Sequence, residues 1–584
     1  MRALELTSRI GETPLRILPT VIDAAAAGCD AVPALLSTAS PPQADQYLTY
    51  GMLARRMRRY ARWAIEQGLQ PGQVVALAMP NRPDYLAIWL GLTSVGVVVA
   101  LININLIGAS LAHCLAIAEP VRLIAAAELA DAVAAAAARL DGAPPMWIHG
   151  GAASERRIDI LVEAYSGEPL TATEQRPVGL SDRALLIYTS GTTGMPKAAH
   201  VSHHRLMMWS HWFAGMLHAG PADRLYNCLP MYHSVGGVVA TGAVLVSGGS
   251  VVLRERFSAR QFWDDVARYD CSLFQYIGEL CRYLLAAPAS PAETAHRLRM
   301  ICGNGLRPDI WMPFKERFRI PHILEFYAAT EGNFSLYNAE GKPGAIGRIP
   351  AFLSHRFPAV LVKFDPETGA PVRDDAGLCI RCARDEVGEA IGKIGADGGS
   401  RFEGYTSAID TEKKLLRDVF APGDRWLRTG DLMRQDEKGF YYFVDRVGDT
   451  FRWKGENVAT TEVAEAIMSC PGVRAATVYG VSVPGADGRA GMAAIVAEPD
   501  FDPVDFRQHV SLHLPDYARP VFLRLVEDLT VTETFKQKKQ DLRREGYDPT
   551  GIADLLYVDD RASKTYRPLD GVLFGQIQGG AIRF

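Results

Sequence analysis

The sequence predicts an α/β protein with a large N-terminal domain of mixed and parallel sheets with helices, and a smaller α+β C-terminal domain. The chain has 584 residues, more than one hydrophobic core supports. Helical and strand patterns alternate over most of its length, which is typical of parallel sheets covered by helices. After about residue 450 the elements become shorter, which indicates a separate compact unit.

The first clear elements are a helix and a strand. Met52–Leu69 has apolar residues on one side, as in an amphipathic helix, and Val74–Met79 (VVALAM) has the composition of a strand. The other side of the helix carries a row of arginines, which we expect to form a solvated surface, with contact to a membrane surface as the alternative. These arginines are Arg55, Arg56, Arg58, Arg59 and Arg62.

The longest apolar run is Leu86–Ile102, which is marginal in length for a membrane span. It changes character at Gly96, because a helical half is followed there by β-branched valines. We therefore predict a buried helix followed by a core strand, and no transmembrane segment.

The remaining elements continue the same alternation. A helix is predicted at Glu128–Leu140, and strands are predicted at Ala184–Thr189 and Ser250–Glu255. A glycine-rich polar stretch at Gly395–Tyr405 and a junction at Asp445–Thr450 interrupt the pattern. Beyond them we predict a strand–turn, a helix and two strands, at 450–458, 460–470, 475–483 and 490–497.

Composition narrows the class of protein. Charged residues make up 22% of the chain and the net charge is -4, which gives no basis for nucleic-acid binding. The nine cysteines include a single CxxC, Cys379 to Cys382, without the second pair that a zinc site needs. We therefore expect buried thiols in a reducing compartment.

The stretch Tyr188–Ala199 (YTSGTTGMPKAA) has the chemistry of a phosphate-binding loop. Glycine backbone amides and the hydroxyls of Ser190, Thr192 and Thr193 supply many donors in a small volume, and Lys197 adds a positive charge. The Walker pattern does not match, because Gly191 and Gly194 are too close together and Ala198 follows the lysine. By composition alone a polar surface turn remains the alternative.

Together with further motifs, this stretch resembles the signature of the acyl-adenylate-forming superfamily. The other motifs follow in the family's order: Leu229–Gly237 (LPMYHSVGG), Cys302–Pro308 (CGNGLRP), Tyr327–Asn333 (YAATEGN), Arg428–Leu432 (RTGDL) and Asp445–Val463. The chain resembles one branch in particular, the fatty acid transport proteins and very-long-chain acyl-CoA synthetases, through Tyr327–Asn333, Asp445–Val463, Glu533–Pro549 and the tail Asp554–Asp570. The resemblance covers nearly the whole chain from Leu48.

The resemblance implies ATP-dependent activation of a long- or very-long-chain fatty acid. The carboxylate attacks the α-phosphorus of ATP to give acyl-AMP and pyrophosphate, and coenzyme A then takes the acyl group as a thioester. Because an anion approaches a polyanion, catalysis is chiefly charge neutralisation and positioning. The implied ATP-binding residues are Tyr188, Thr189, Ser190, Gly191, Thr192, Thr193, Gly194, Lys197, Gly303, Asn304, Gly305, Tyr327, Ala328, Thr330, Asp431 and Arg446.

The same resemblance implies a role for each of several residues. Thr330 would donate to the α-phosphate, while Glu331 and Thr192 would hold Mg²⁺. Tyr327 would lie against the adenine, and Asp431 would accept bonds from the ribose hydroxyls. Lys536 is the expected mobile catalytic lysine, with Lys538 and Lys539 as competitors. Glu533 departs from the glycine that is usual in this branch.

The resemblance also implies two domains, an adenylation domain at 1–447 and a mobile C-terminal domain at 448–584, with Gly448 as the hinge. Lys454, Gly455 and Glu456 would line the coenzyme A tunnel. His233, Val235 and Gly236 would border the acyl pocket, where His233 is expected to pack rather than transfer protons. The small residues that come after His233 are compatible either with a pocket or with close helix packing.

Three alternatives remain: a fatty-acid transporter acting in uptake, an enzyme that passes the acyl group to a carrier protein, and a bile-acid or aryl-CoA ligase of the same branch. The expected partners are the fatty acid and coenzyme A, without nucleic acid. The sequence leaves open a homodimer and a peripheral membrane contact. We expect a cytoplasmic protein, with the inner face of the cell membrane as a place of peripheral attachment.

Overall fold

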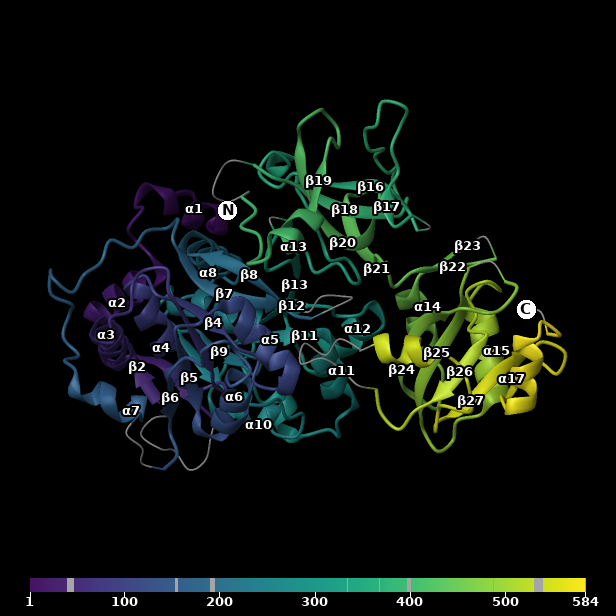
Figure 1. Ribbon diagram of the computed structural model, residues 1–584, viewed down its shortest axis with the longest axis horizontal. Helices are drawn as coiled ribbons and strands as arrows, with labels where there is room; N and C mark the ends of the chain where they lie inside the picture. Colours follow the sequence, from purple (N-terminus) through teal and green to yellow (C-terminus); the bar gives the residue numbers. More distant parts are fainter. Residues whose placement is uncertain are drawn as a thin grey trace. The chain divides into compact units, whose positions relative to one another are not determined.

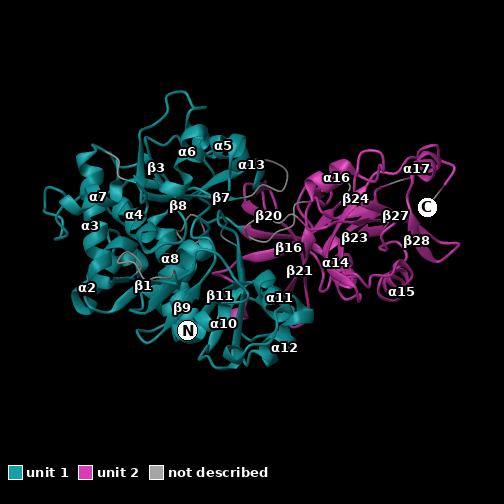
Figure 2. Ribbon diagram, turned by 90° about the horizontal axis from the view of Figure 1, so that it is seen from below, with its two compact units in different colours: residues 1–348, 393–415 teal, residues 349–392, 416–584 magenta. Residues whose placement is uncertain are grey.

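The chain folds into two compact units, which Figure 2 shows in different colours. The computed structural model describes residues 1–38, 47–152, 156–189, 195–332, 334–366, 368–395, 401–454, 456–486, 488–529, 539–582 and 584. Unit 1 comprises Met1–Arg348 and Lys393–Leu415, and unit 2 comprises Ile349–Gly392 and Leu416–Phe584. The predicted division at residue 448 stays a prediction.

The first sheet of unit 1 ends in the strand pair around the predicted phosphate loop. Its neighbouring strands are parallel, apart from the antiparallel last pair, β7 and β8. In spatial order the strands are β6 (Met146–His149), β5 (Arg122–Ala126), β3 (Val74–Ala78), β4 (Val98–Leu101), β7 (Arg183–Thr189) and β8 (Lys197–Ser202).

The second sheet of unit 1 carries parts of two further motifs, Cys302–Pro308 and Tyr327–Asn333. It is parallel through its centre and antiparallel at both edges. In spatial order its strands are β14 (Ser335–Asn338), β13 (His322–Ala328), β12 (Met300–Asn304), β11 (Leu273–Ile277), β9 (Arg224–Asn227), β10 (Ser250–Leu253), β1 (Pro33–Ser37) and β2 (Tyr47–Thr49).

Helices and a short strand complete unit 1 (Figure 1). The helix α4 is apolar nearly all round, as befits a helix buried on every side. The elements are α1 (Arg2–Ser8), α2 (Leu18–Cys29), α3 (Tyr50–Glu66), α4 (Pro83–Ser94), α5 (Gly108–Ala118), α6 (Ala130–Ala137), α7 (Ile158–Leu161), α8 (His203–Met216), α9 (Ala240–Leu245), α10 (Phe262–Arg268), α11 (Gly278–Ala286), α12 (Pro308–Arg317), β15 (Gly347–Arg348) and α13 (Ala408–Lys413).

Unit 2 contains a first sheet, a short hairpin and a five-stranded sheet. The first sheet holds β16 (Ala359–Asp365), β17 (Ala370–Pro371), β18 (Gly388–Lys393), β19 (Leu415–Arg417), β20 (Arg425–Gln435) and β21 (Phe440–Arg446). The hairpin is β22 (Phe451–Trp453) and β23 (Glu456–Val458). The five strands are β24 (Val473–Val481), β25 (Ala490–Ala497), β26 (Phe522–Leu525), β27 (Leu555–Asp560) and β28 (Thr565–Pro568).

Four helices lie in the described residues of the C-terminal part of unit 2. Among them α14 packs against β24, and α15 packs against β28. One apolar core includes residues of both helices and of the five-stranded sheet, and it also includes the hairpin residues Phe451 and Trp453. The helices are α14 (Thr460–Met468), α15 (Pro503–His513), α16 (Gln540–Glu545) and α17 (Gly571–Gln578).

The predicted elements and the predicted fold class are confirmed. The run Leu86–Ile102 divides as expected into the end of α4 and the strand β4. None of the helices in the described ranges combines the length and apolarity that a bilayer crossing needs. All nine cysteines are free and seven of them are buried.

The prediction of a solvated arginine surface on α3 is wrong for most of the row. Only Arg55 is exposed, whereas the other four are half-buried. Each arginine meets a carboxylate from elsewhere in unit 1, as in the 2.7 Å pair between Arg56 and the buried Asp84. The remaining pairs are Arg55–Asp30, Arg58–Asp23, Arg59–Glu163 and Arg62–Glu174.

Candidate active site

The predicted phosphate loop lies between β7 and β8, two antiparallel strands whose ends are paired at Thr189 and Lys197. Tyr188 is buried and its hydroxyl donates to the Cys114 carbonyl oxygen at 2.7 Å, so its side chain anchors the strand in the core. Ser190, Gly191, Thr192, Thr193 and Gly194 lie outside the described residues. The structure therefore describes the two strands that frame the loop.

Lys197 is held at the start of β8 by residues of a later segment. Its ammonium lies 2.8 Å from an Asp410 oxygen and 5.7 Å from the centre of the Tyr405 ring. The backbone of β8 also accepts a bond from Thr406 and donates one to Gly404. Residues 401–415 are thus attached directly to the strand that carries the predicted phosphate-binding lysine.

Thr330 and Glu331 follow the carboxyl end of β13, where polar side chains gather at a sheet edge. The Thr330 hydroxyl lies 3.0 Å from that of Ser234. Glu331 is buried and accepts a 2.6 Å hydrogen bond from the Tyr405 hydroxyl. Its carboxylate also lies 3.5 Å from the Lys414 ammonium.

The carboxylate of Glu331 is kept ionised. Burial by itself would raise the pKa, but the Lys414 charge and the Tyr405 hydroxyl outweigh burial and lower the pKa of Glu331 below its ordinary value. Because Tyr405 lies beside both Lys197 and Glu331, the phosphate-loop lysine and the predicted metal ligand converge on one side chain.

Arg205 fixes the backbone around this pair. It is buried near the start of α8, and one of its terminal nitrogens donates to the carbonyl oxygens of Thr330 and Gly332 at 2.8 and 3.2 Å. The other donates to the carbonyl oxygen of Arg401 at 3.0 Å. A single guanidinium therefore joins the loop after β13 to the segment that supplies Tyr405.

Gly303 and Asn304 end β12, and a buried carboxylate from the neighbouring strand β13 holds the backbone that follows. Glu325 accepts hydrogen bonds from the Gly305 amide, from the Leu306 amide at 3.3 Å and from the Tyr276 hydroxyl. The Asn304 side-chain oxygen is shielded from solvent and has no hydrogen-bond partner within the described residues. The loop after β12 thus presents a hydrogen-bond acceptor that has no described partner, beside a backbone that Glu325 holds in place.

Desolvation raises the pKa of Glu325 to about 8, although the bonds from Tyr276, Gly305 and Leu306 moderate the shift. A carboxyl at its ordinary pKa of 4.5 loses its proton in the unfolded chain well before it does in the folded protein. Between these two pH values the folded state binds more protons, so this group makes stability fall as pH rises. The neutral Glu325→Gln variant lacks that dependence.

We therefore expect the melting temperature of Glu325→Gln, relative to that of the wild type, to increase steadily between pH 5 and pH 8.5. The measurement is thermal unfolding of both proteins across this range. Contributions from the other titrating groups cancel in the difference. A difference that stays constant with pH would contradict the buried, proton-retaining state of Glu325.

Tyr327 and Ala328 close β13. The Tyr327 ring is half-buried and meets Phe334 edge-on, with ring centres 5.5 Å apart. The predicted adenine contact of Tyr327 stays a prediction, as do the nucleotide contacts of Ala328 and of the Gly303–Gly305 loop.

The predicted acyl-pocket residues begin a short π-helix, Val235–Val239. His233 is half-buried beside Tyr232, with ring centres 4.7 Å apart. A side chain at Gly236 or Gly237 would collide with backbone oxygens of Pro230 or Met231, so close packing accounts for both glycines. The role of His233, Val235 and Gly236 in an acyl pocket stays a prediction.

In unit 2, Asp431 and Arg446 lie opposite each other on β20 and β21. Asp431 is buried, and one of its oxygens lies 3.6 Å from the Arg446 guanidinium. The neighbouring Asp445 accepts hydrogen bonds from the amide and the hydroxyl of Thr460. Gly448 follows with a φ of 91°, a conformation that favours glycine, and nothing lies within 4 Å of where its Cβ would be.

Two of the three candidate catalytic lysines lie outside the described residues, namely Lys536 and Lys538. Lys539 is described, and its ammonium donates to the Thr460 hydroxyl at 2.8 Å and lies 3.5 Å from Asp449. Lys454 is in the turn of the β22–β23 hairpin and Glu456 begins β23, while Gly455 between them lies outside the described residues.

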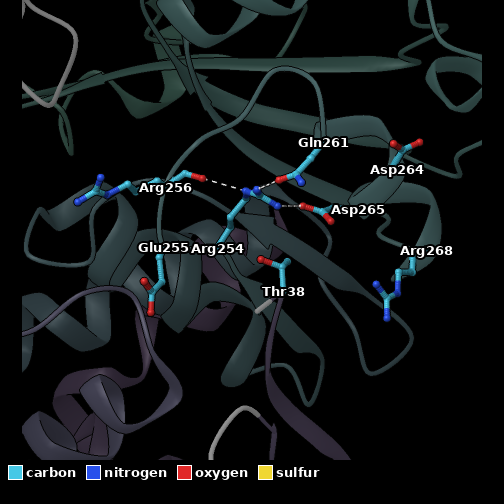
Figure 3. A pocket seen from close by; sticks show the side chains of 8 residues that line it. All are labelled: Thr38, Arg254, Glu255, Arg256, Gln261, Asp264, Asp265 and Arg268. Carbon is cyan, nitrogen blue, oxygen red and sulfur yellow. Dashed lines mark hydrogen bonds and ion pairs between the residues drawn. The ribbon is translucent and has the colours of Figure 1, made fainter. Parts of the chain in front are cut away.

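A polar pocket of about 560 Å³ occurs elsewhere in unit 1 (Figure 3). Its central side chain, Arg254, already binds Asp265, Gln261 and the carbonyl oxygen of Arg256. None of the predicted site residues lines this pocket. Because its central charge is satisfied internally, we assign no role to it.

Sequence reasoning missed Arg205, Glu325, Tyr405 and Lys414. Each acts through a contact with a distant segment, so no local motif marks it. The one signal was the polar stretch that ends at Tyr405, which was interpreted only as a break in the pattern.

Comparisons with known proteins show the family of the chain. Residues 22–404 match the AMP-binding enzyme family, and residues 462–536 match the AMP-binding enzyme C-terminal domain. The chain is similar to long-chain fatty acid transport protein 1 of Mus musculus, with 44% identity covering 88% of this chain and 80% of that one. It is similar to long-chain fatty acid transport protein 2 of Rattus norvegicus, with 41% identity covering 91% and 87%.

Solved structures support the fold. An anthranilate CoA ligase in complex with anthranoyl-AMP superposes with a TM-score of 0.77 at 18% identity, covering 92% of this chain and 98% of that one. ATP-bound MatB from Rhodopseudomonas palustris superposes with a TM-score of 0.74 at 24% identity, covering 91% and 100%. The two units therefore have the fold of adenylate-forming enzymes. The chain belongs to the AMP-binding enzyme family and, within it, to the long-chain fatty acid transport proteins.

Proposed function

We propose that the protein is an AMP-forming acyl-CoA synthetase for long- or very-long-chain fatty acids. It joins the fatty carboxylate to the α-phosphate of ATP, releases pyrophosphate, and transfers the acyl group to the thiol of coenzyme A with release of AMP. The observation that carries the proposal is the convergence of Lys197 and Glu331 on Tyr405. The fatty-acid substrate follows from the names of the relatives at 41–44% identity.

The carboxylate of Glu331 fits Mg²⁺. The cation prefers oxygen ligands and usually takes one or two carboxylates together with substrate phosphates. Glu331 offers one buried, ionised carboxylate. No cluster of three or more acidic, histidine or cysteine side chains capable of holding a metal occurs in the described part of the chain. When bound, Mg²⁺ would neutralise phosphate charge, and Glu331 with Thr192 would hold it.

The remaining chemistry is positioning and charge. Lys197 and the loop hydroxyls of Ser190, Thr192 and Thr193 would hold the β- and γ-phosphates, with Asp410 releasing Lys197 for this task. Thr330 would donate to the α-phosphate, and Arg205 fixes the Thr330 backbone for that contact. Lys536 would neutralise the two anions that react.

Asp431 and Arg446 stay our proposed ligands of the ribose. The proposed mobile domain, with Gly448 as its hinge, would exchange Lys536 for the coenzyme A thiol after adenylation. Lys454, Gly455 and Glu456 would face that second substrate.

The test is pyrophosphate release across acids from acetate to very-long-chain fatty acids, with and without coenzyme A. We expect release to depend on a long-chain acid, with AMP and acyl-CoA formed in equal amounts when coenzyme A is present. The preference follows from the relatives, which are long-chain proteins by name. Preference for short or aromatic acids would refute the proposed substrate class.

Fatty-acid uptake is a second candidate role, favoured by the names of the same relatives. Trapping the acid as its thioester would drive uptake without a channel. Fatty acids partition into lipid, so a cytoplasmic enzyme attached to the inner face of the cell membrane would meet its substrate there. Uptake into sealed vesicles that continues without ATP and coenzyme A would instead indicate a true transporter.

A further inference from the structure

Three loops at one part of unit 2 bring three cations to one carboxylate, that of Asp516. Arg519 lies 3.3 Å from one Asp516 oxygen, and Arg561 lies 3.2 Å from the other. The Lys454 ammonium lies 3.8 Å from the same oxygen as Arg561. We call Lys454, Arg519 and Arg561 the basic triad.

The triad comes from separate elements of one folded unit. Lys454 is in the turn between β22 and β23, Arg519 lies between α15 and β26, and Arg561 lies in the turn between β27 and β28. These elements share the apolar core that contains Trp453, next to Lys454. Two backbone carbonyls, those of Leu514 and Ser511, also hold the Arg519 guanidinium. The convergence is therefore a fixed property of the fold.

Charge in the triad is not balanced. Asp516 supplies one negative charge against three positive ones, and its side chain is 59% exposed. Two acids at the end of β27 have cations of their own, because Asp559 pairs with Arg507 at 2.5 Å and Asp560 lies 3.7 Å from Arg567. Among the described residues, about two positive charges of the triad thus remain without a carboxylate partner.

The hairpin turn sets the backbone of Lys454. It is the first residue of the two-residue turn that joins β22 to β23, and its φ of 53° is the left-handed conformation that such turns require. Desolvation and the nearby charge of Arg561 lower the pKa of the Lys454 ammonium, although Asp516 and Asp559 oppose this. An added anion would relieve the repulsion between the two cations.

We propose that the basic triad binds the 3′-phosphate of coenzyme A. A phosphate monoester carries close to two negative charges at neutral pH, which matches the excess charge of the triad. Guanidinium groups bind phosphate oxygens through paired N–H donors, and a lysine adds a point charge. This inference rests on the proposed function, which supplies coenzyme A as a phosphate-bearing substrate besides ATP.

The experiment compares coenzyme A with 3′-dephospho-coenzyme A as acyl acceptors. The wild type should have a KM for the dephospho form that is roughly tenfold or more higher, because charge-assisted hydrogen bonds are lost. In Arg561→Gln and Lys454→Gln the KM for coenzyme A should rise toward that of the dephospho form, so the ratio of the two values falls toward one. The matched control is Arg474→Gln, an exposed arginine on β24, which should keep the wild-type ratio.

Equal KM values of the wild type for both acceptors would overturn the proposal. So would a triad variant that keeps the wild-type ratio, or one that raises only the KM for ATP, which would assign the triad to the nucleotide. Failure of the proposed function is distinguishable, because the wild type would then release no pyrophosphate in response to fatty acid.

Discussion

Lys536→Ala is expected to lose adenylation and to retain thioester formation from supplied acyl-AMP. The lysine is proposed to neutralise the fatty carboxylate and the α-phosphate while they approach each other, a charge problem that exists only in the first step. Loss of one preorganised electrostatic contact in a transition state costs about 10²–10³-fold in rate. The measurement is acid-dependent exchange of labelled pyrophosphate into ATP, beside acyl-CoA formation from synthetic acyl-AMP.

Lys539→Ala is the comparison that identifies the lysine. The Lys539 ammonium is already bound to Thr460 and Asp449, so we expect its loss to leave the exchange rate within a few-fold of the wild type. Equal losses in both half-reactions for Lys536→Ala would reject the division of labour. A large loss of exchange in Lys539→Ala instead would transfer the role to that residue.

Glu331→Gln should reduce adenylation by roughly 10²–10³-fold and raise the Mg²⁺ concentration needed for half-maximal rate. The substitution keeps the size of the side chain and removes its negative charge. In the wild type, Lys414 and Tyr405 keep the Glu331 carboxylate ionised. The measurement is pyrophosphate exchange as a function of Mg²⁺ at saturating ATP and fatty acid.

Two variants make this prediction specific. Tyr405→Phe removes only the hydroxyl that donates to Glu331, so a smaller loss of about tenfold is expected from one charge-assisted hydrogen bond. Glu316→Gln, at an exposed glutamate of α12, is the matched control and should resemble the wild type. An unchanged Mg²⁺ requirement in Glu331→Gln would exclude this carboxylate as a metal ligand.

The local sequence pattern was sufficient to predict individual helices and strands. The change from helix to strand within Leu86–Ile102 follows from composition, and α4 and β4 lie where it predicts. The order of strands in the sheets could not be obtained in this way. For example, β1 pairs with β10, more than 200 residues later, and no local signal connects them.

The arginines of α3 show why the prediction of a solvated face was wrong. Amphipathicity gives the side of a helix that faces the core, but it does not show which loops return to cover the other side. Asp84 and Glu163 return to α3 from later in the chain, so Arg56 and Arg59 are half-buried in ion pairs. Long-range pairing of this kind is invisible to periodicity.

The residues of the candidate site were predicted from sequence motifs. The structural evidence for the site comes from contacts between segments that are far apart in the sequence. Thr330, Glu331 and Lys197 were predicted because each belongs to a stretch that resembles a family signature. Tyr405 and Arg205 were not, because their importance comes from where the chain returns in space. The contacts of Ser190–Gly194 and of Lys536 stay predictions, since these residues lie outside the described part of the chain.

The most direct measurement of the central claim is exchange of labelled pyrophosphate into ATP by the wild-type protein in the absence of coenzyme A. Adenylation beside Glu331 predicts exchange that requires both a long-chain fatty acid and Mg²⁺. Exchange that occurs only with coenzyme A present, or none with any fatty acid, would contradict it.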